Sequence, residues 1–367
     1  MKPQIPYAQT TRWGRELEYA TEAIASNWVG SGSYLPRFEH MIATTIGVEH
    51  AIAVCNGTAA LHASYLALGL KAGDEVVIPA FCYLAGANVA LQLGLTPVFV
   101  DVDPNTFCIT AENISTGLTS RTRAVLVVHS YGAVCDMDSI LGLCESRNIH
   151  CIEDSAEAFG SARSGYRAGS KGVLGTVSFH AAKTVSTGEG GAILTNDSSI
   201  AESLRQFRSH GSLRERYFHD LPGHNFRLTN LQAALGCAQL EAWEQIVKGR
   251  ERVHRLYQRA LERIEGVSLQ EISPQESPVI WAVAIKIDVR KKGRNLSRIL
   301  ARLKKSGIEA RNGFRCASEH TIYGSMRFPT PISDDLARTV LSLPTYPSLT
   351  ESDVEYVASQ LEMALDE

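Results

Sequence analysis

Residues 176–195 read TVSFHAAKTVSTGEGGAILT and place one lysine, Lys183, between two short apolar runs. The first run ends at Phe179, small residues follow over 186–191, and the second run begins at Ala192. This order is typical of a strand, a turn that carries an amine, a glycine hinge and a second strand. An isolated lysine usually belongs to a surface loop, because removing an ammonium from water is costly. The strand-flanked, largely uncharged setting of Lys183 instead indicates a functional role.

The composition is that of an ordinary globular protein, with 44% hydrophobic and 20% charged residues among 367. This length is enough for one large domain and a smaller one. The formal net charge of −3 gives no indication of a nucleic-acid or membrane partner. The beginning of the chain lacks an apolar signal segment, and no apolar run is long enough to span a membrane. We therefore expect a cytoplasmic protein.

The cysteine pattern and the missing motifs exclude several classes of site. None of the eight cysteines forms a C-x-x-C pair, and Cys55, Cys151 and Cys237 lie in apolar runs. They are expected to be small buried thiols in a reducing compartment rather than a disulfide framework. No G-x-G-x-x-G follows a strand, residues 165–171 lack P-loop spacing, and no H-E-x-x-H occurs, so no metal site is predicted.

Short apolar segments alternate with helical stretches over the first half of the chain. Unbroken apolar strands separated by helices predict an α/β fold with a mainly parallel sheet covered on both faces. In such a sheet, ligands gather at the carboxyl ends of the strands. The strand candidates are 51–55, 75–79, 97–101, 124–129, 150–154, 176–180 and 191–195.

The flanking segments predict further helices and a second domain. We divide the chain into a large cofactor-binding domain, 1–245, and a small C-terminal α/β domain, 246–367, joined by a long helix. A strand is expected at 279–287. The expected helices cover 15–26, 35–46, 198–209, 230–264, 295–305 and 351–365.

Polar and glycine residues follow the first strand. Asn56 or Thr58 can cap the helix that begins there, and Gly57 beside that helix N-terminus leaves backbone N–H groups directed at one spot. Such an arrangement binds phosphate, although N-capping alone is the more common use of this pattern.

Aromatic and acidic residues follow two other strands. Phe81 is expected in the core, and Tyr83 is placed to stack on a planar ligand. Glu153, Asp154 and Glu157 follow the fifth strand, where acids are poorly placed for burial unless a cation meets them. An acid at a helix N-terminus is stabilised by the helix dipole. This explanation is adequate for the presence of Glu153 and less adequate for that of Asp154.

One ligand needs an amine, a strand-end acid, an aromatic platform and a phosphate cradle, here Gly57, Thr58 and Ser178. Pyridoxal 5′-phosphate bonds to a lysine through its aldehyde, and its ring nitrogen requires a carboxylate partner that keeps it protonated. A nucleophilic lysine also needs a pKa well below about 10.4, and burial beside a protonated ring can supply that shift.

Eight segments resemble, in register, the DegT/DnrJ/EryC1/StrS family of pyridoxal-phosphate-dependent sugar aminotransferases. They are SNWVGSGSYLPRFE (26–39), CNGTAALH (55–62), LGLKAGDEVVIPAF (68–81), TPVFVDVDP (96–104), VVHSYGAVCDMD (127–138), IEDSAEAFGS (152–161), SFHAAKTVSTGEGGAILTND (178–197) and HNFRLTNLQAALGCAQLE (224–241).

The resemblance implies an aspartate aminotransferase-like fold (fold type I) with a seven-stranded, mainly parallel sheet domain and a smaller C-terminal domain. It also implies a homodimer with a shared active site. By position, Lys183 resembles the family's cofactor-bound, proton-shuttling lysine. The other implied roles are Asp154 at the pyridine nitrogen, Glu157 near the 3′-oxygen, Tyr83 stacked on the ring, Gly57, Thr58 and Ser178 at the phosphate, and Asn225 reaching in from the partner subunit.

Within the family, the sugar-nucleotide 4-aminotransferases are the most similar. The implied reaction moves an amino group from L-glutamate to a nucleotide-linked 4-keto-6-deoxyhexose. The alternatives are amination of another keto position or of a cyclitol ketone, or a non-catalytic regulator on the same fold. Related 3-dehydratases carry a histidine at this position, so Lys183 argues against a dehydratase. The segment 307–323 departs from the family pattern, because Asn-Gly-Phe follows Arg311 where relatives carry a proline-containing pocket segment.

Overall fold

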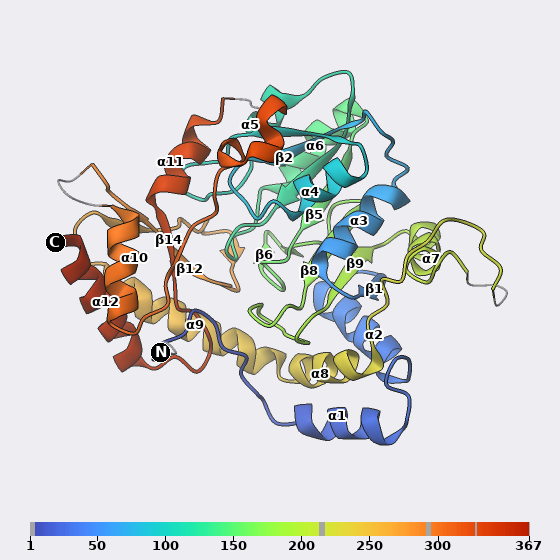
Figure 1. Ribbon diagram of the computed structural model, residues 1–367, viewed down its shortest axis with the longest axis horizontal. Helices are drawn as coiled ribbons and strands as arrows, with labels where there is room; N and C mark the ends of the chain where they lie inside the picture. The colour runs from blue at the N-terminus through green and yellow to red at the C-terminus, as the bar shows by residue number, and fades with distance from the viewer. Residues whose placement is uncertain (1–3, 213–216, 291–294, 327–328, 367) are drawn as a thin grey trace.

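The computed structural model describes residues 4–212, 217–290, 295–326 and 329–366. Its centre is a seven-stranded sheet in the order β1-β9-β8-β5-β4-β2-β3 (Figure 1). Strand β9 pairs antiparallel with both of its neighbours, and the other pairings are parallel. The strands are β1 (His50–Val54), β2 (Glu75–Pro79), β3 (Thr96–Val100), β4 (Thr122–Val128), β5 (His150–Asp154), β8 (Leu174–Ser178) and β9 (Gly191–Thr195). All seven predicted strands and the fold class are confirmed.

Helices cover both faces of this sheet, which is why its strands are apolar throughout. Successive residues of a strand point to opposite faces, so Ile52 belongs to one core cluster and Ala53 to another. One face is covered by α3 (Gly57–Ala67), α4 (Ala85–Gln92) and α7 (Ser198–Phe207). The other face is covered by α2 (Tyr34–Ile46), α5 (Ala111–Gly117), α6 (Met137–Arg147) and α8 (Asn230–Glu241). Helix α1 (Glu16–Ala25) packs against α8.

The helix expected over 230–264 is in fact two helices, which corrects the prediction. Helix α8 ends at Glu241 and α9 (Trp243–Leu261) begins after Ala242, whose backbone leaves the helical region. Trp243 packs at the break against Phe159, with ring centroids 5.4 Å apart. The change of direction lets α8 pack under the sheet while α9 buries its apolar stripe in the C-terminal core (Figure 1).

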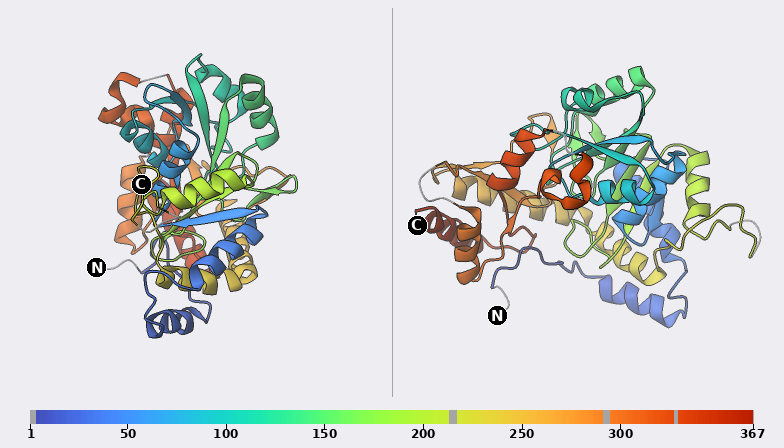
Figure 2. Two further views of the ribbon diagram at one scale, coloured as in Figure 1. Left: turned by 90° about the vertical axis from the view of Figure 1, so that its right-hand side faces the viewer. Right: turned by 45° about the horizontal axis from the view of Figure 1, so that its top comes forward.

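The C-terminal part is built on a four-stranded antiparallel sheet in the order β10-β12-β14-β13. Its core also contains Ile5, whose backbone bonds to residues 307 and 309. The division at residue 245 stays a prediction. Figure 2 shows α12 and α7 at opposite ends of the molecule. The elements are β10 (Val267–Leu269), β12 (Val283–Ile287), β13 (Arg311–Asn312), β14 (Val340–Leu343), α10 (Leu296–Lys305), α11 (Pro331–Thr339) and α12 (Glu351–Asp366).

The strand expected at 279–287 begins only at Val283. The carbonyls of Ile280 and Trp281 instead accept hydrogen bonds from Arg250, so these residues cannot use them in the sheet ladder. The chain just before this segment is joined to the large sheet domain by a small three-stranded sheet. Its strands are β11 (Glu276–Ser277), β6 (Ala162–Arg163) and β7 (Tyr166–Arg167). Two short 3₁₀ helices, Ala317–Glu319 and Thr321–Met326, follow β13.

All eight cysteines are free thiols; seven are buried, as the sequence predicts, whereas Cys55 is only partly buried. Within the described ranges, no helix is both long and apolar enough to cross a membrane.

Candidate active site

A cavity of about 830 Å³ lies at the carboxyl edge of the large sheet. The ends of β1, β4, β5 and β8 line one side of it, and the C-terminal sheet contributes β13 and β14. Seven of the eight residues predicted for the site line this cavity: Gly57, Thr58, Tyr83, Asp154, Glu157, Ser178 and Lys183. Asn225 does not line it. The Asn225 side chain is exposed and accepts a hydrogen bond from Nε of Arg227 at 3.0 Å.

Lys183 lies in the turn after β8, where its backbone N–H bonds to the carbonyl of His180 at 2.8 Å. Its Nζ lies 3.8 Å from the centroid of the Trp281 ring. Burial lowers the pKa of Lys183 below that of a free lysine, while Glu157 and Asp154 oppose this shift. A larger share of the amine is therefore unprotonated and nucleophilic than in a surface lysine.

Two buried carboxylates face this amine. Burial raises the pKa of Asp154, although the N–H of Ala156, which bonds to its Oδ1 at 3.0 Å, lowers it. Burial also raises the pKa of Glu157 to about 7, against the opposing effects of Lys183 and of the Tyr131 backbone N–H, which donates to its carboxylate at 2.9 Å. For both acids, burial outweighs the partners that favour the charged form, as expected of groups that await a cationic or proton-donating ligand.

Glu153 corrects the sequence interpretation. It does not stabilise a helix N-terminus, because residues 155–161 form turns rather than a helix. Its side chain is fully buried and accepts hydrogen bonds from Nε2 of His129 at 2.8 Å and from the backbone N–H groups of Gly169 and Gly172 at 2.9 and 2.6 Å. Burial alone would raise its pKa, but these bonds lower it. Glu153 therefore stabilises the loop before β8 through these hydrogen bonds.

The N-terminus of α3 and Ser178 form the expected cradle. Asn56, rather than Thr58, caps α3 by accepting the N–H of Ala59 at 2.8 Å. The N–H groups of Gly57 and Thr58 have no acceptor among the residues the structure describes. A Cβ on Gly57 would lie 3.1 Å from Cβ of Ser178, so glycine is what allows these two segments to approach. Free N–H groups at a helix N-terminus beside a hydroxyl suit a phosphate.

Phe81 is buried in the core, as predicted, and packs edge-on against Phe107 and Phe314. Tyr83 is 68% exposed at the mouth of the cavity. The sequence interpretation missed Trp281 and Tyr131, which also line the cavity. No local signal marks them, because each lies in a segment whose neighbours across the cavity are far away in the sequence.

The atypical segment 307–323 does reach the cavity. Arg311 and Asn312 form β13, and both line the wall that faces the sheet domain. The guanidinium of Arg311 lies 4.0 Å from the centroid of the Tyr7 ring and pairs with Glu309 at 2.8 Å.

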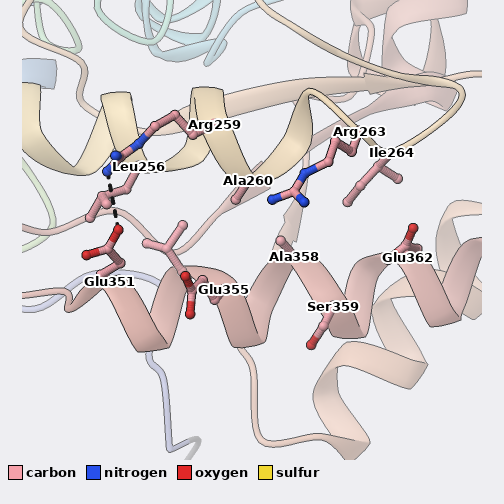
Figure 3. A pocket seen from close by; sticks show the side chains of 11 residues that line it. Leu256, Arg259, Ala260, Arg263, Ile264, Glu351, Glu355, Ala358, Ser359 and Glu362 are labelled. Carbon is pink, nitrogen blue, oxygen red and sulfur yellow. Dashed lines mark hydrogen bonds and ion pairs between the residues drawn. The ribbon is translucent and has the colours of Figure 1, made fainter.

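A second hollow, of about 510 Å³, lies between α9 and α12 and contains none of the predicted residues (Figure 3). Arg259 of α9 and Arg263, which lies just beyond the end of that helix, line this hollow opposite acidic residues of α12, and Arg259 pairs with Glu351 at 3.3 Å. Both side chains of this pair are exposed, and such pairs contribute at most about 1 kcal/mol. This hollow is a charged surface groove.

An amine with a lowered pKa, a strand-end carboxylate and a phosphate cradle in one cavity fit pyridoxal phosphate. Together with the sheet order, they define a fold type I pyridoxal-phosphate enzyme. The chain matches the sequence profile of the DegT/DnrJ/EryC1/StrS aminotransferase family over residues 12–362 and belongs to that family.

Individual relatives agree with this assignment. The chain is 36% identical to a GDP-perosamine synthase from Escherichia coli O157:H7, with 97% of both chains covered. It is 37% identical to a GDP-perosamine synthase from Caulobacter vibrioides, with 99% of both covered. Among solved structures, the aminotransferase TlmJ from Streptoalloteichus hindustanus is 29% identical, with a TM-score of 0.93 over 99% of each chain.

The predicted family, fold type I architecture, transaminase activity and cofactor are thereby confirmed. The chain is a pyridoxal-phosphate-dependent sugar aminotransferase, and the alternative of a non-catalytic regulator is set aside.

Proposed function

We propose that this enzyme transfers the amino group of L-glutamate to C4 of a nucleotide-linked 4-keto-6-deoxyhexose and produces a 4-amino-4,6-dideoxy sugar nucleotide. The observation that carries the proposal is the placement of Lys183, Asp154 and Glu157 in one cavity beside a phosphate cradle. Similarity to two GDP-perosamine synthases over nearly the whole chain favours a GDP-linked sugar as the acceptor.

Seven residues of the cavity have a proposed part in holding the cofactor. When bound, pyridoxal phosphate supplies an electron sink for the carbon that loses a proton. Lys183 would bond to it, and the carboxylate of Asp154 would hold the proton of its ring nitrogen. Glu157 would contact its 3′-oxygen, and Tyr83 would contact its ring. The N–H groups of Gly57 and Thr58 and the hydroxyl of Ser178 would hold its phosphate.

Lys183 also moves protons. Nζ would accept the proton that the α-carbon of glutamate loses, and it would later return a proton to the sugar carbon that receives the amino group. The lowered pKa of Lys183 suits the first of these steps, because a free amine is needed as the base. The two nearby carboxylates favour the ammonium form that the second step needs.

We also propose that the active form is a homodimer in which Asn225 of one subunit reaches the phosphate cradle of the other. In one subunit, Thr58 and Tyr83 are exposed at the mouth of the cavity, and Asn225 is exposed elsewhere. The apolar side chains of Leu17, Ile24 and Trp28 are exposed as well and suit a subunit interface. A fully active monomer in sedimentation experiments at assay concentration contradicts this assembly.

The substrate is tested by incubating the protein, pyridoxal phosphate and L-glutamate with a panel of ketoses. The panel contains GDP-linked, dTDP-linked and UDP-linked 4-keto-6-deoxyhexoses, their 3-keto isomers and a cyclitol ketone. Mass spectrometry detects replacement of the carbonyl oxygen by an amino group, and NMR locates the aminated carbon. Amination of the GDP-linked 4-keto sugar supports the proposal. Preference for a 3-keto sugar or for the cyclitol ketone overturns it.

A further inference from the structure

Trp281 makes two contacts with the segment that carries Lys183. Its indole N–H donates to the carbonyl of Ala182 at 2.8 Å, and its ring face lies 3.8 Å from Nζ of Lys183. The first contact fixes the turn, and the second gives the amine a neighbour that attracts a cation but takes no proton. One side chain therefore contacts both the backbone of this turn and its amine.

Trp281 is held in place through both its backbone and its ring. The backbone N–H of Trp281 bonds to the carbonyl of Tyr131 at 3.1 Å, and the two rings stack with centroids 6.0 Å apart at an angle of 15°. Nη1 of Arg250 donates to the carbonyls of Ile280 and Trp281 at 3.0 and 2.8 Å. Tyr131 also stacks on Phe314, with centroids 5.0 Å apart. Tyr131 thus contacts the indole directly, Arg250 holds the backbone that carries it, and Phe314 acts on the indole only through Tyr131.

Arg250 is unusual because its partners are neutral. It is buried in α9, its Nε has no hydrogen-bond partner among the described residues, and burial lowers its pKa to about 10. Burying a guanidinium against carbonyls alone is costly. Arg252, on the same helix, makes the same kind of bond to the carbonyls of Pro347 and Leu349, but its side chain is not buried.

We propose that Trp281 is a second functional residue at the reacting amine, with Arg250 as its positioning residue. The indole face receives Nζ of Lys183 whenever that amine is not bonded to the cofactor, and the indole N–H keeps the turn in register. This inference rests on the proposed role of Lys183 and deepens it. During turnover, the amine is repeatedly released and protonated, and the ring holds it near the carbons between which it carries protons.

The charges around Lys183 show why a neutral ring suits this task. Asp154 and Glu157 favour the ammonium form, and Arg250 opposes it. A carboxylate in the place of Trp281 would hold the ammonium too firmly or take its proton. An aliphatic side chain would leave the ammonium without a partner on that side. The indole stabilises the charged amine without competing for its proton.

The test measures the pKa of Lys183 in cofactor-free protein, from the pH dependence of acetylation at Lys183 followed by peptide mass spectrometry. Trp281→Leu removes both contacts, and we expect its Lys183 pKa to fall by about one unit, the size of a desolvated cation–π contact. Trp281→Phe keeps a ring face but loses the N–H, so its pKa should fall by less than half as much.

Turnover with L-glutamate separates positioning from binding. We expect kcat to fall about 10- to 100-fold in Trp281→Leu and only a few-fold in Trp281→Phe, with KM for glutamate little changed, because the contact is made by the enzyme's own amine. Arg250→Met should reproduce part of the Trp281→Leu effect. Its matched control, Arg252→Met, should leave the labelling curve and kcat unchanged.

A labelling curve for Lys183 that is the same in wild type, Trp281→Phe and Trp281→Leu overturns the inference. If Arg250→Met does not fold, Trp281→Phe and Trp281→Leu still provide this test. A failure of the proposed function looks different. The proposed function fails if borohydride reduction places the cofactor on another lysine, or if no keto sugar is aminated. In either case the labelling curve of Lys183 still shows whether Trp281 affects its pKa.

Discussion

Two acids that follow each other on β5 have opposite surroundings. Glu153 points away from the cavity and accepts hydrogen bonds from His129 and from the backbone N–H groups of residues 169, 171 and 172. Asp154 points into the cavity, and burial raises its pKa. The difference teaches that burial by itself does not mark a functional acid. Glu153, whose carboxylate has its hydrogen bonds satisfied, stabilises the fold. Asp154, whose partners do not offset its burial, is available to a ligand.

The largest effect should come from the amine that faces Asp154. Lys183→Ala should abolish transamination, a loss of at least about four decades in rate, because no other amine can reach the cofactor from this turn. The absorbance band of cofactor bonded to a protein amine should vanish as well. Lys171→Ala, which removes an exposed lysine on the preceding loop, is the control and should behave like wild type. A variant lacking Lys183 that keeps turnover refutes the assignment.

Asp154→Asn should slow the half-reaction with L-glutamate by about two to four decades, which corresponds to roughly 3–5 kcal/mol for a lost ion pair expressed in the transition state. The shape of the side chain is kept, so the free energy of unfolding should change little. Stopped-flow bleaching of the bound cofactor measures the rate. A rate within a few-fold of wild type would make Asp154 a structural acid like its neighbour.

Glu153→Gln is the mirror-image experiment. The amide NH₂ would face backbone donors of the 169–172 loop, so we expect a loss of roughly 2–4 kcal/mol in the free energy of unfolding. Protein that does fold should retain most of its kcat. Urea unfolding and steady-state assays on this variant and on Asp154→Asn measure both quantities side by side. A variant that is stable but inactive would erase the distinction between the two acids.

The smallest effect concerns Glu157, whose pKa burial raises from 4.5 to about 7. Between these values the folded state binds more protons than the unfolded state, so stability should fall as pH rises through this window and level off above it. The expected loss in cofactor-free protein is about 3 kcal/mol. Glu157→Gln should remove most of this slope and leave the contribution of Asp154, whose pKa burial also raises. Unfolding curves at several pH values test it, and an unchanged slope in the variant rules out burial of Glu157 as its cause.

The sequence predicts the large sheet well, because strands buried on both faces are apolar throughout and stand out from the helices between them. The residues of the cavity follow from the same pattern, since they stand directly after strands. The helix break at Ala242 was missed, because the apolar spacing continues through it and only the packing of Trp243 against Phe159 interrupts the helix.

The contrasting roles of Glu153 and Asp154 could be predicted only in part. Alternation along a strand places them on opposite faces, but the sequence does not say which face holds His129 and which holds Lys183. Trp281 and Arg250 could not be found at all, because their contacts with the lysine turn join segments that are distant in the chain. Tertiary packing alone brings them together.

The indole beside Lys183 also gives the protein an optical signal of its own. Among the described residues, Trp281 is the one of the four tryptophans that lines the cavity. A chromophore bonded to Lys183 would lie in contact with this indole and quench its fluorescence by energy transfer. Titration of cofactor-free protein with pyridoxal phosphate should therefore dim the emission by at least the share that Trp281 contributes, and the dimming should be smaller in Trp281→Phe.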